Sequence, residues 1–249
     1  MERRLIDILI GHRGEPVSWP ENSLAGYREV LQAGARYIET DVQITADGVP
    51  VLCHDPSLLK ITGHDLPVTR TTSIDVLALP AGHPERFGER YKDYRIATLA
   101  EFASLLARWP DAHAFVEIKH ASVVAFGAGK VIDIMLEALA DVLSQCILIS
   151  FEFEPLQHVR DRTLMPIGWV VPHWSDDSRR MAESLAPEFL FINKKRLPPP
   201  PAPLWNGPWC WVVYIVNEAD AIAPLLARGF NLIETNVIRS LLPGRTGHD

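Results

Sequence analysis

A regular alternation of short apolar runs with amphipathic segments constrains the fold of this 249-residue chain more than any other feature. The apolar runs are rich in the residue types that favour strands, and stretches of helical period separate most of them. Eight strands are predicted, at residues 5–10, 35–41, 114–118, 147–151, 165–170, 188–192, 209–214 and 231–234. Helices are predicted at 24–33, 99–107, 128–142, 155–160, 177–185 and 219–227, with a short last one at 237–242. This order and length predict an α/β fold, a single (β/α)8 TIM barrel spanning residues 1–249.

Two segments depart from the simple alternation. Residues 49–53 form a ninth apolar run with no helix before it, and Asp47-Gly48 is a tight-turn signal. We therefore expect a β-hairpin after the second barrel strand, with residues 53–55 opposite residues 39–41. Residues 55–97 are rich in Pro and Gly and are expected to form an irregular insertion over the barrel mouth. The proline run at 198–203 excludes a regular helix and predicts an irregular crossover.

Composition narrows the range of partners. A net charge of −7 gives no general attraction for nucleic acid, and no apolar run approaches the roughly 20 residues of a membrane-spanning helix. The run at 5–10 is too short for a signal peptide and contains Asp7. Three scattered cysteines argue against a disulfide framework. We expect a soluble cytoplasmic protein with a small-molecule partner and without integral membrane association; the oligomeric state is left open.

Ionisable residues gather near the ends of the predicted strands. Glu39 and Asp41 stand two residues apart and share one face of a strand, and Glu117 ends another. Three inward carboxylates repel one another unless a hard cation such as Mg²⁺ or Ca²⁺ neutralises them. The alternative is that they are exposed at strand ends or paired with Arg13 and Lys119.

Two histidines, His12 and His54, also end apolar runs. A lone histidine at such a position more often bonds a backbone carbonyl, but two beside three carboxylates can act as general acid and base. Other histidines show no ligand spacing and are expected on the surface or in loops: His64, His83, His113, His120, His158, His173 and His248.

Six short motifs occur in one order: H-R-G at 12–14, P-E-N-S at 20–23, E-T-D-V at 39–42, T-A-D-G at 45–48, H-D at 54–55 and E-I-K at 117–119. Together they resemble the glycerophosphodiester phosphodiesterase family over nearly the whole chain. The resemblance implies a divalent metal held by Glu39, Asp41 and Glu117, with His12 and His54 as acid and base in unassigned order. It implies hydrolysis of glycerophosphodiesters to sn-glycerol 3-phosphate and an alcohol, a reaction of lipid and glycerol metabolism. Either water or the substrate's vicinal hydroxyl attacks first, the latter through a cyclic phosphate.

Arg13 and Lys119 are predicted to bind substrate, because a guanidinium suits the two non-bridging oxygens of a phosphodiester. Charge balance for nearby carboxylates is the alternative. Glu21 and Asn22 are predicted to support the site, with Glu21 orienting Arg13.

The chain departs from the family at its edges. Trp211 matches a family tryptophan only with a shifted asparagine, and either it or Tyr214 is expected to stack on the glycerol backbone, with core packing as the alternative. The last strand ends in Glu234-Thr235-Asn236 where the family commonly has I-T-D, which weakens any role for the last loop.

The motif that follows His54-Asp55 has also lost its usual arginine. The alcohol pocket is therefore open to change, and the second hypothesis is a relative acting on a lipid-type diester, as a lysophospholipase D does. Trp169 and Trp174 near the mouth, together with the insertion at 55–97, would then decide between a small polar and a lipid-sized pocket. A third hypothesis is a non-catalytic barrel that binds phosphodiesters.

Overall fold

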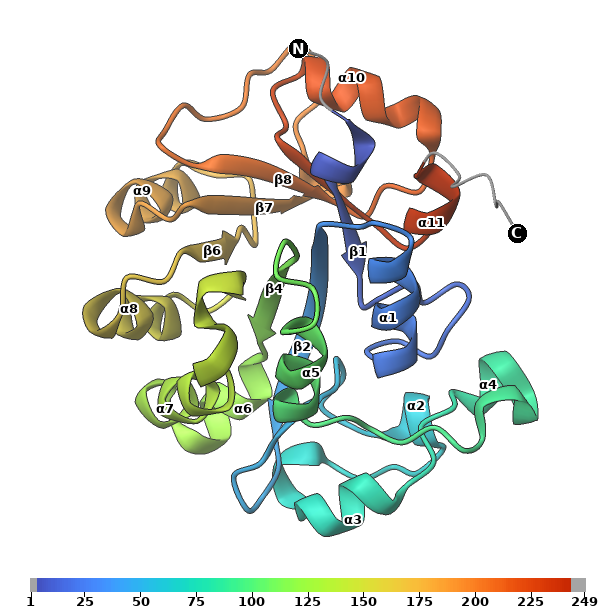
Figure 1. The fold of residues 1–249 in the computed structure, drawn as a ribbon. Coiled ribbons are helices and arrows are strands. Elements are labelled where there is room, and N and C mark those ends of the chain that lie inside the picture. Colours follow the sequence, from blue (N-terminus) through green and yellow to red (C-terminus); the bar gives the residue numbers. More distant parts are fainter. Residues whose placement is uncertain (1–3, 243–249) are drawn as a thin grey trace.

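A computed structural model describes residues 4–242 and contains a closed barrel of eight parallel strands (Figure 1). The strands are β1 (Leu9–His12), β2 (Tyr37–Ile44), β4 (His113–Ile118), β5 (Cys146–Ser150), β6 (Ile167–Val170), β7 (Phe189–Asn193), β8 (Cys210–Tyr214) and β9 (Leu232–Thr235). Strand β1 closes the barrel because it pairs with both β9 and β2. The predicted TIM barrel is confirmed. His248 lies outside the described residues.

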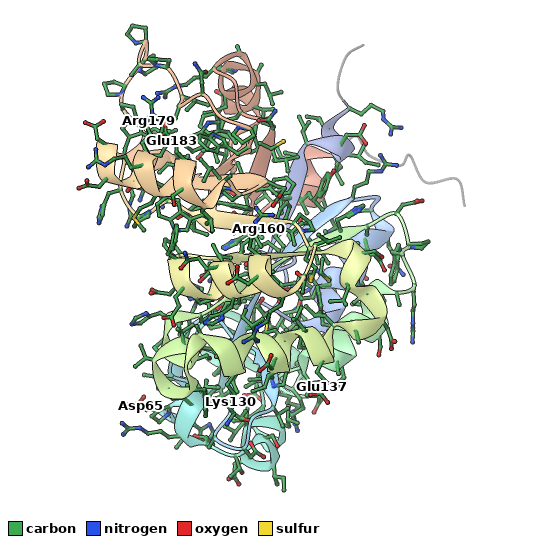
Figure 2. The ribbon with its side chains drawn as sticks, turned by 90° about the vertical axis from the view of Figure 1, so that its left-hand side faces the viewer. Asp65, Lys130, Glu137, Arg160, Arg179 and Glu183 are labelled. Atoms are coloured by element: carbon green, nitrogen blue, oxygen red, sulfur yellow. The ribbon has the colours of Figure 1, made fainter. Side chains whose placement is uncertain are left out.

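Helices surround the barrel. They are α1 (Leu24–Gln32), α5 (Leu99–Leu106), α6 (His120–Phe126), α7 (Ala128–Ala138), α8 (Phe153–Arg162), α9 (Asp176–Leu185), α10 (Ile222–Ala227) and α11 (Ile238–Leu241). Figure 2 shows the charged side chains Lys130, Glu137, Arg179 and Glu183 on the outer faces of α7 and α9, where all four are exposed. Short 3-10 helices are η4 (Ala140–Gln145), η5 (Lys194–Arg196) and η6 (Ala219–Ala221). None of the helices within residues 4–242 has both the length and the apolar character needed to span a bilayer.

The sequence misplaced two elements. The first predicted strand began at Leu5, but Leu5–Asp7 is a 3-10 helix, η1, whose Asp7 carboxylate pairs with Arg4 and Arg36, and β1 starts at Leu9. Helix α6 was not predicted; it is short, only its Ser122 is fully buried, and Val124 is 71% exposed. The crossover between β7 and β8 is irregular, as the prolines predicted.

The two-residue period of the strands sorts side chains between two cores. One set points into the barrel and packs there: Ile10, Phe115, Ile147, Ile149, Val170, Phe191, Val212 and Leu232. The alternate positions face the helices and join the larger outer core. Residues two positions beyond an inner apolar residue, such as His12, Glu117 and Glu234, therefore project into the barrel at its carboxyl end.

The predicted hairpin is confirmed. Strand β3 (Pro50–Leu52) pairs antiparallel with β2, with Leu52 opposite Val42 and Pro50 opposite Ile44. The Cys53 N–H continues the ladder by donating to the Asp41 carbonyl at 3.0 Å. Gly48 supplies the left-handed conformation of the turn, with a φ of 87°. His54 consequently enters the site beside Asp41 although it belongs to no barrel strand.

The insertion that follows the hairpin contains short helices: α2 (Leu59–Thr62), η2 (Val68–Arg70), α3 (Ser73–Ala78), α4 (Pro84–Phe87) and η3 (Gly88–Tyr91). It shares a small core with β3, in which Val51 packs with Leu58 and Val76 of the insertion. The insertion packs on the loop before α1, where the Tyr91 hydroxyl donates to the Ser18 carbonyl at 2.6 Å. It lies beside α1 and α5 (Figure 1). That it roofs the barrel mouth stays a prediction: its residues are not among those that line the central cavity, but Lys60 Nζ reaches Glu21 Oε2 at 2.6 Å.

Candidate active site

A cavity of about 100 Å³ opens at the carboxyl end of the barrel. Charged and ionisable side chains form one wall: His12, Arg13, Glu39, His54, Glu117, Lys119 and Glu234. The opposite wall consists of Ile149, Phe151, Val170, Phe191 and Tyr214. The cavity can thus receive an anionic group on one side and carbon-rich groups on the other.

The three predicted carboxylates meet in this cavity. Glu39, Asp41 and Glu117 each offer an oxygen within 4.8 Å of the others. Asp41 is fully buried and its oxygens lie 2.9 Å from Arg13 Nε and 3.2 Å from Lys119 Nζ. Burial alone would raise the pKa of Asp41, but these two cations hold it well below its usual range. Asp41 is therefore ionised.

Glu39 has a different environment. One of its oxygens accepts from the Arg13 backbone N–H at 3.1 Å, while the other, Oε1, is buried without a hydrogen-bond partner. Burial, with the charges of Asp41 and Glu234 nearby, raises the pKa of Glu39 well above its usual value. Glu117 is also raised in pKa by burial, although its oxygen pairs with Lys119 Nζ at 2.7 Å. The cluster thus places three carboxyl groups beside two cations, Arg13 and Lys119, and Oε1 of Glu39 lacks a donor or cation.

The turn after β1 places Arg13. Arg13 and Gly14 both have positive φ values, 49° and 79°. A Cβ on Gly14 would lie 3.2 Å from the backbone of Gly26, so the glycine permits both the conformation and the close approach of α1. The strained conformation of Arg13 is held by its backbone bond to Glu39 and its side-chain contact with Asp41. The backbone N–H of Arg13 thus binds Glu39, and its guanidinium binds Asp41.

Asn22 links the same loop to β2. Its side-chain carbonyl accepts from the Tyr27 hydroxyl at 2.7 Å, from Thr40 Oγ1 at 3.1 Å and from the Asp41 N–H at 3.2 Å. Its amide donates to Asp41 Oδ2 at 3.0 Å. Asn22 thereby orients Asp41 from two sides.

Glu21, predicted to support the site, lies beside two cations. Glu21 Oε2 lies 3.6 Å from Arg13 Nη1 and 2.6 Å from Lys60 Nζ. Lys60 comes from α2 of the insertion, at the point where the family motif usually has arginine. The cation missing from the motif is therefore replaced by a lysine that points to the site's edge.

His12 and His54 face the cavity from neighbouring elements. His12 Nδ1 lies 2.6 Å from Asn236 Oδ1, and its Nε2 lies 3.9 Å from Glu39 and 3.7 Å from Glu234. His54 Nδ1 lies 2.6 Å from Asp55 Oδ1. Burial lowers the pKa of both, that of His12 to about 3. Each ring has one nitrogen held by a side chain and the other available to the cavity.

Two site residues were missed in the sequence. Glu234 is 4% exposed and lines the cavity, and burial raises its pKa to about 8. Asn236 contacts His12 although 224 residues separate them. The signal for Glu234 was its position two residues after the inward Leu232, the same relation that places Glu117 after Phe115. The last loop, for which the sequence weakened any assigned role, contacts His12 through Asn236.

Of the aromatic residues considered in the sequence, only Tyr214 lines the cavity. Trp211 alternates with the inward Val212, so it faces outward, where its ring lies 5.6 Å from that of Trp174, and it does not line the cavity. Tyr214 does line it, so of the two residues considered for glycerol contact, only Tyr214 is in position. Trp169 is fully buried in the outer core. Trp169 and Trp174 therefore cannot set the size of the mouth; Phe151, which is 37% exposed, stands there instead.

Comparison with known proteins gives one consistent family. Residues 12–195 match the model of the glycerophosphoryl diester phosphodiesterase family. A glycerophosphodiester phosphodiesterase of Caldanaerobacter subterraneus subsp. tengcongensis is 30% identical over 194 residues, covering 74% of this chain and 77% of that protein.

Solved structures share the fold. An Oleispira antarctica phosphodiesterase in complex with the product sn-glycerol-3-phosphate superposes with a TM-score of 0.81 at 21% identity, covering 94% of both chains. A glycerophosphodiester phosphodiesterase of Agrobacterium tumefaciens has a TM-score of 0.72 at 20% identity, covering 94% of this chain and 98% of that one.

Proposed function

Because this chain belongs to the glycerophosphoryl diester phosphodiesterase family and is a phosphoric diester hydrolase, we propose that it converts glycerophosphodiesters to sn-glycerol 3-phosphate and an alcohol in a metal-dependent reaction. The observation that carries the proposal is the meeting of Glu39, Asp41 and Glu117 with His12 and His54 around one cavity. The product bound to the Oleispira antarctica relative supports the same substrate class.

The residues fit a divalent cation. The cavity corner contains the carboxyl groups of Glu39, Asp41, Glu117 and Glu234 against the cations of Arg13 and Lys119. Oε1 of Glu39 is buried and has no hydrogen-bond partner, which is the environment expected of a carboxylate oxygen that binds a cation. Glu39, Asp41 and Glu117 would hold it, with Mg²⁺ and Ca²⁺ both suited to an all-oxygen set. When bound, such a cation stabilises negative charge on a phosphoryl oxygen.

The side chains of the cavity divide the remaining work. Arg13 and Lys119 lie at its charged wall and bind the non-bridging phosphoryl oxygens, while ion pairs with Asp41 keep both extended towards it. His12 and His54 transfer the two protons: one leaves the attacking oxygen, of water or of the substrate's vicinal hydroxyl, and one reaches the departing alkoxide. Tyr214 and Phe151 contact the carbon skeleton of the substrate.

The size of the cavity favours a small polar substrate. About 100 Å³ is well below the roughly 300–1,000 Å³ of pockets that enclose drug-sized ligands. A glycerophosphoryl group would occupy it, and an acyl chain would remain outside, near the exposed Phe151. We therefore place glycerophosphodiesters with small alcohols ahead of lysophospholipids. The cytoplasmic location stays a prediction.

A substrate panel tests the proposal. Glycerophosphocholine, glycerophosphoethanolamine, glycerophosphoinositol and lysophosphatidylcholine are incubated with the chain, and glycerol 3-phosphate is measured with Mg²⁺, with Ca²⁺ and with excess EDTA. We expect release from the small diesters that EDTA abolishes and added metal restores. Activity that persists in EDTA would refute the metal, and no product from any diester would favour the non-catalytic barrel.

A pair of variants makes the metal assignment specific. Glu117→Gln removes a charge from the carboxylate cluster, whereas Glu152→Gln removes one from the rim, where Glu152 pairs with His120 at 2.9 Å. We expect Glu117→Gln to weaken Mn²⁺ binding, measured calorimetrically, and Glu152→Gln to leave it unchanged. Equal Mn²⁺ affinities of the two variants would show that the cation does not bind at Glu117.

A further inference from the structure

The contact between His12 and Asn236 joins the first barrel strand to the loop after the last one. His12 Nδ1 and Asn236 Oδ1 are 2.6 Å apart, a short hydrogen bond for a neutral pair. Asn236 is itself fixed, because its backbone N–H donates to Asn217 Oδ1 at 3.0 Å. The same oxygen accepts from Thr235 Oγ1 at 3.2 Å. The loops after β8 and β9 thus place the Asn236 amide against His12.

We propose that Asn236 is a positioning residue, which holds the His12 imidazole as the Nδ1–H tautomer and leaves the Nε2 electron pair directed at the substrate. The inference rests on the proton-transfer role proposed above for His12. It goes beyond that role, because it assigns the reacting atom and names the group that selects it.

The tautomer follows from the chemistry of the two partners. A neutral imidazole has one donor and one acceptor nitrogen, and an amide oxygen can only accept. Asn236 Oδ1 therefore requires the hydrogen on Nδ1. The opposite amide orientation would require it on Nε2, so the tautomer reports directly on this contact.

The surroundings of Nε2 leave that atom free. Its nearest carboxyl oxygens, on Glu234 and Glu39, lie at 3.7 and 3.9 Å, beyond the range of a hydrogen bond. His12 also lines the cavity, with 14% of its side chain exposed. The attacking oxygen, of water or of the substrate's vicinal hydroxyl, would give its proton to Nε2 as it bonds to phosphorus, while the bond from phosphorus to the departing alkoxide breaks.

The two cavity histidines have different partners. His54 Nδ1 faces the carboxylate of Asp55, whereas His12 Nδ1 faces an uncharged amide. Asn236→Asp would give His12 the same kind of acceptor and keep the hydrogen on Nδ1. Asn236→Ala removes the acceptor, and the ring is then free to rotate and to exchange tautomers. These two variants separate the acceptor role of Asn236 from any effect of changing the loop.

The direct test is long-range ¹H–¹⁵N NMR of the protein labelled at its histidine nitrogens, with His12→Gln used to assign the His12 signals. We expect the wild type and Asn236→Asp to show His12 with its hydrogen on Nδ1. Asn236→Ala should show a mixture of tautomers. A hydrogen on Nε2 in the wild type, or an unchanged tautomer in Asn236→Ala, would overturn the proposal.

Kinetics on glycerophosphocholine add a second readout. Removing a side chain that orients a site histidine typically costs about 10- to 100-fold in activity, so Asn236→Ala should lose that much kcat with KM within twofold. The kcat of Asn236→Asp should be at least tenfold higher than that of Asn236→Ala. The control Asn206→Ala, in an exposed loop, should have the kcat of the wild type. A loss in KM alone, or no recovery in Asn236→Asp, would assign Asn236 to loop structure only. If His12→Gln is fully active, the proton-transfer role fails, while the NMR result on Asn236 still stands.

Discussion

Replacing Asn22 should destabilise the barrel more than replacing any single surface residue. Asn22 is 3% exposed, and its side chain makes four hydrogen bonds, to Tyr27, Thr40 and twice to Asp41. In Asn22→Gly the buried Asp41 N–H and Thr40 hydroxyl lose their acceptor, while Tyr27 keeps its bond to the Glu39 carbonyl at 3.1 Å. At about 1–3 kcal/mol for each of these two unsatisfied groups, the free energy of unfolding should fall by roughly 2–6 kcal/mol.

The backbone at this position separates two contributions. Asn22 has a φ of 58°, in the left-handed region that glycine adopts freely and alanine does not. Asn22→Ala should therefore lose about 1 kcal/mol more than Asn22→Gly, although alanine is ordinarily the more stabilising of the two. The pair distinguishes the side-chain network from the conformation of the turn.

Urea unfolding followed by circular dichroism measures both differences, with Asn206→Ala as the control expected within about 0.5 kcal/mol of the wild type. At roughly 2–4 °C per kcal/mol for a chain of this size, Asn22→Gly should also lower Tm by about 10 °C. The reasoning is refuted if Asn22→Gly loses less than about 1 kcal/mol, or if Asn22→Ala is as stable as Asn22→Gly.

Three further outcomes are expected. His54→Ala should lower kcat at least about 100-fold with an unchanged urea midpoint, and wild-type rates on every diester would remove His54 from the chemistry. Hydrogen bonds from Thr45 and Ser73 lower the pKa of Asp47 to about 2, so its contribution to stability is complete above its unfolded-state pKa near 4 and is lost as pH falls towards 2. Urea midpoints measured from pH 5 to pH 2 should therefore converge for wild type and Asp47→Asn, and parallel curves would contradict this. Trp211→Phe should lower stability by about 1–2 kcal/mol, since it loses a buried N–H bond and ring volume, with KM unaltered; a raised KM would restore it to the substrate pocket.

The barrel and its hairpin were predictable because both rest on local signals. Strand and helix periods alternate along the chain, and Asp47-Gly48 fixes a turn whose register then brings His54 to Asp41. The two-residue period of the strands also predicts which side chains face the cavity, and this was not used for Trp211 and Glu234. Val212 and Tyr214 share a face, so Trp211 must lie on the other, and Glu234 shares the face of Leu232.

Other parts of the site have no local signal. The left-handed conformations of Arg13 and Asn22 are held by tertiary hydrogen bonds to Glu39 and Asp41. The sequence near Arg13 and Asn22 gives no signal for these bonds. The His12–Asn236 contact depends on closure of the barrel across its first and last strands. The docking of the insertion on Ser18 and Trp19 has no local signal either, since it depends on aromatic packing rather than on the turn that begins the insertion.

The insertion also makes the site divisible. Lys60 belongs to the insertion and His54 directly precedes it, and the insertion shares a small core with β3, while the carboxylates, Arg13 and His12 belong to the barrel. A segment of this kind is a candidate for cooperative opening at a lower free energy than the whole domain. Opening would withdraw one histidine and one cation together and leave the carboxylate cluster assembled. Catalytic competence and cation binding would then have separate stabilities within one chain, and hydrogen exchange would detect them as two protection classes, one for the insertion and one for the barrel.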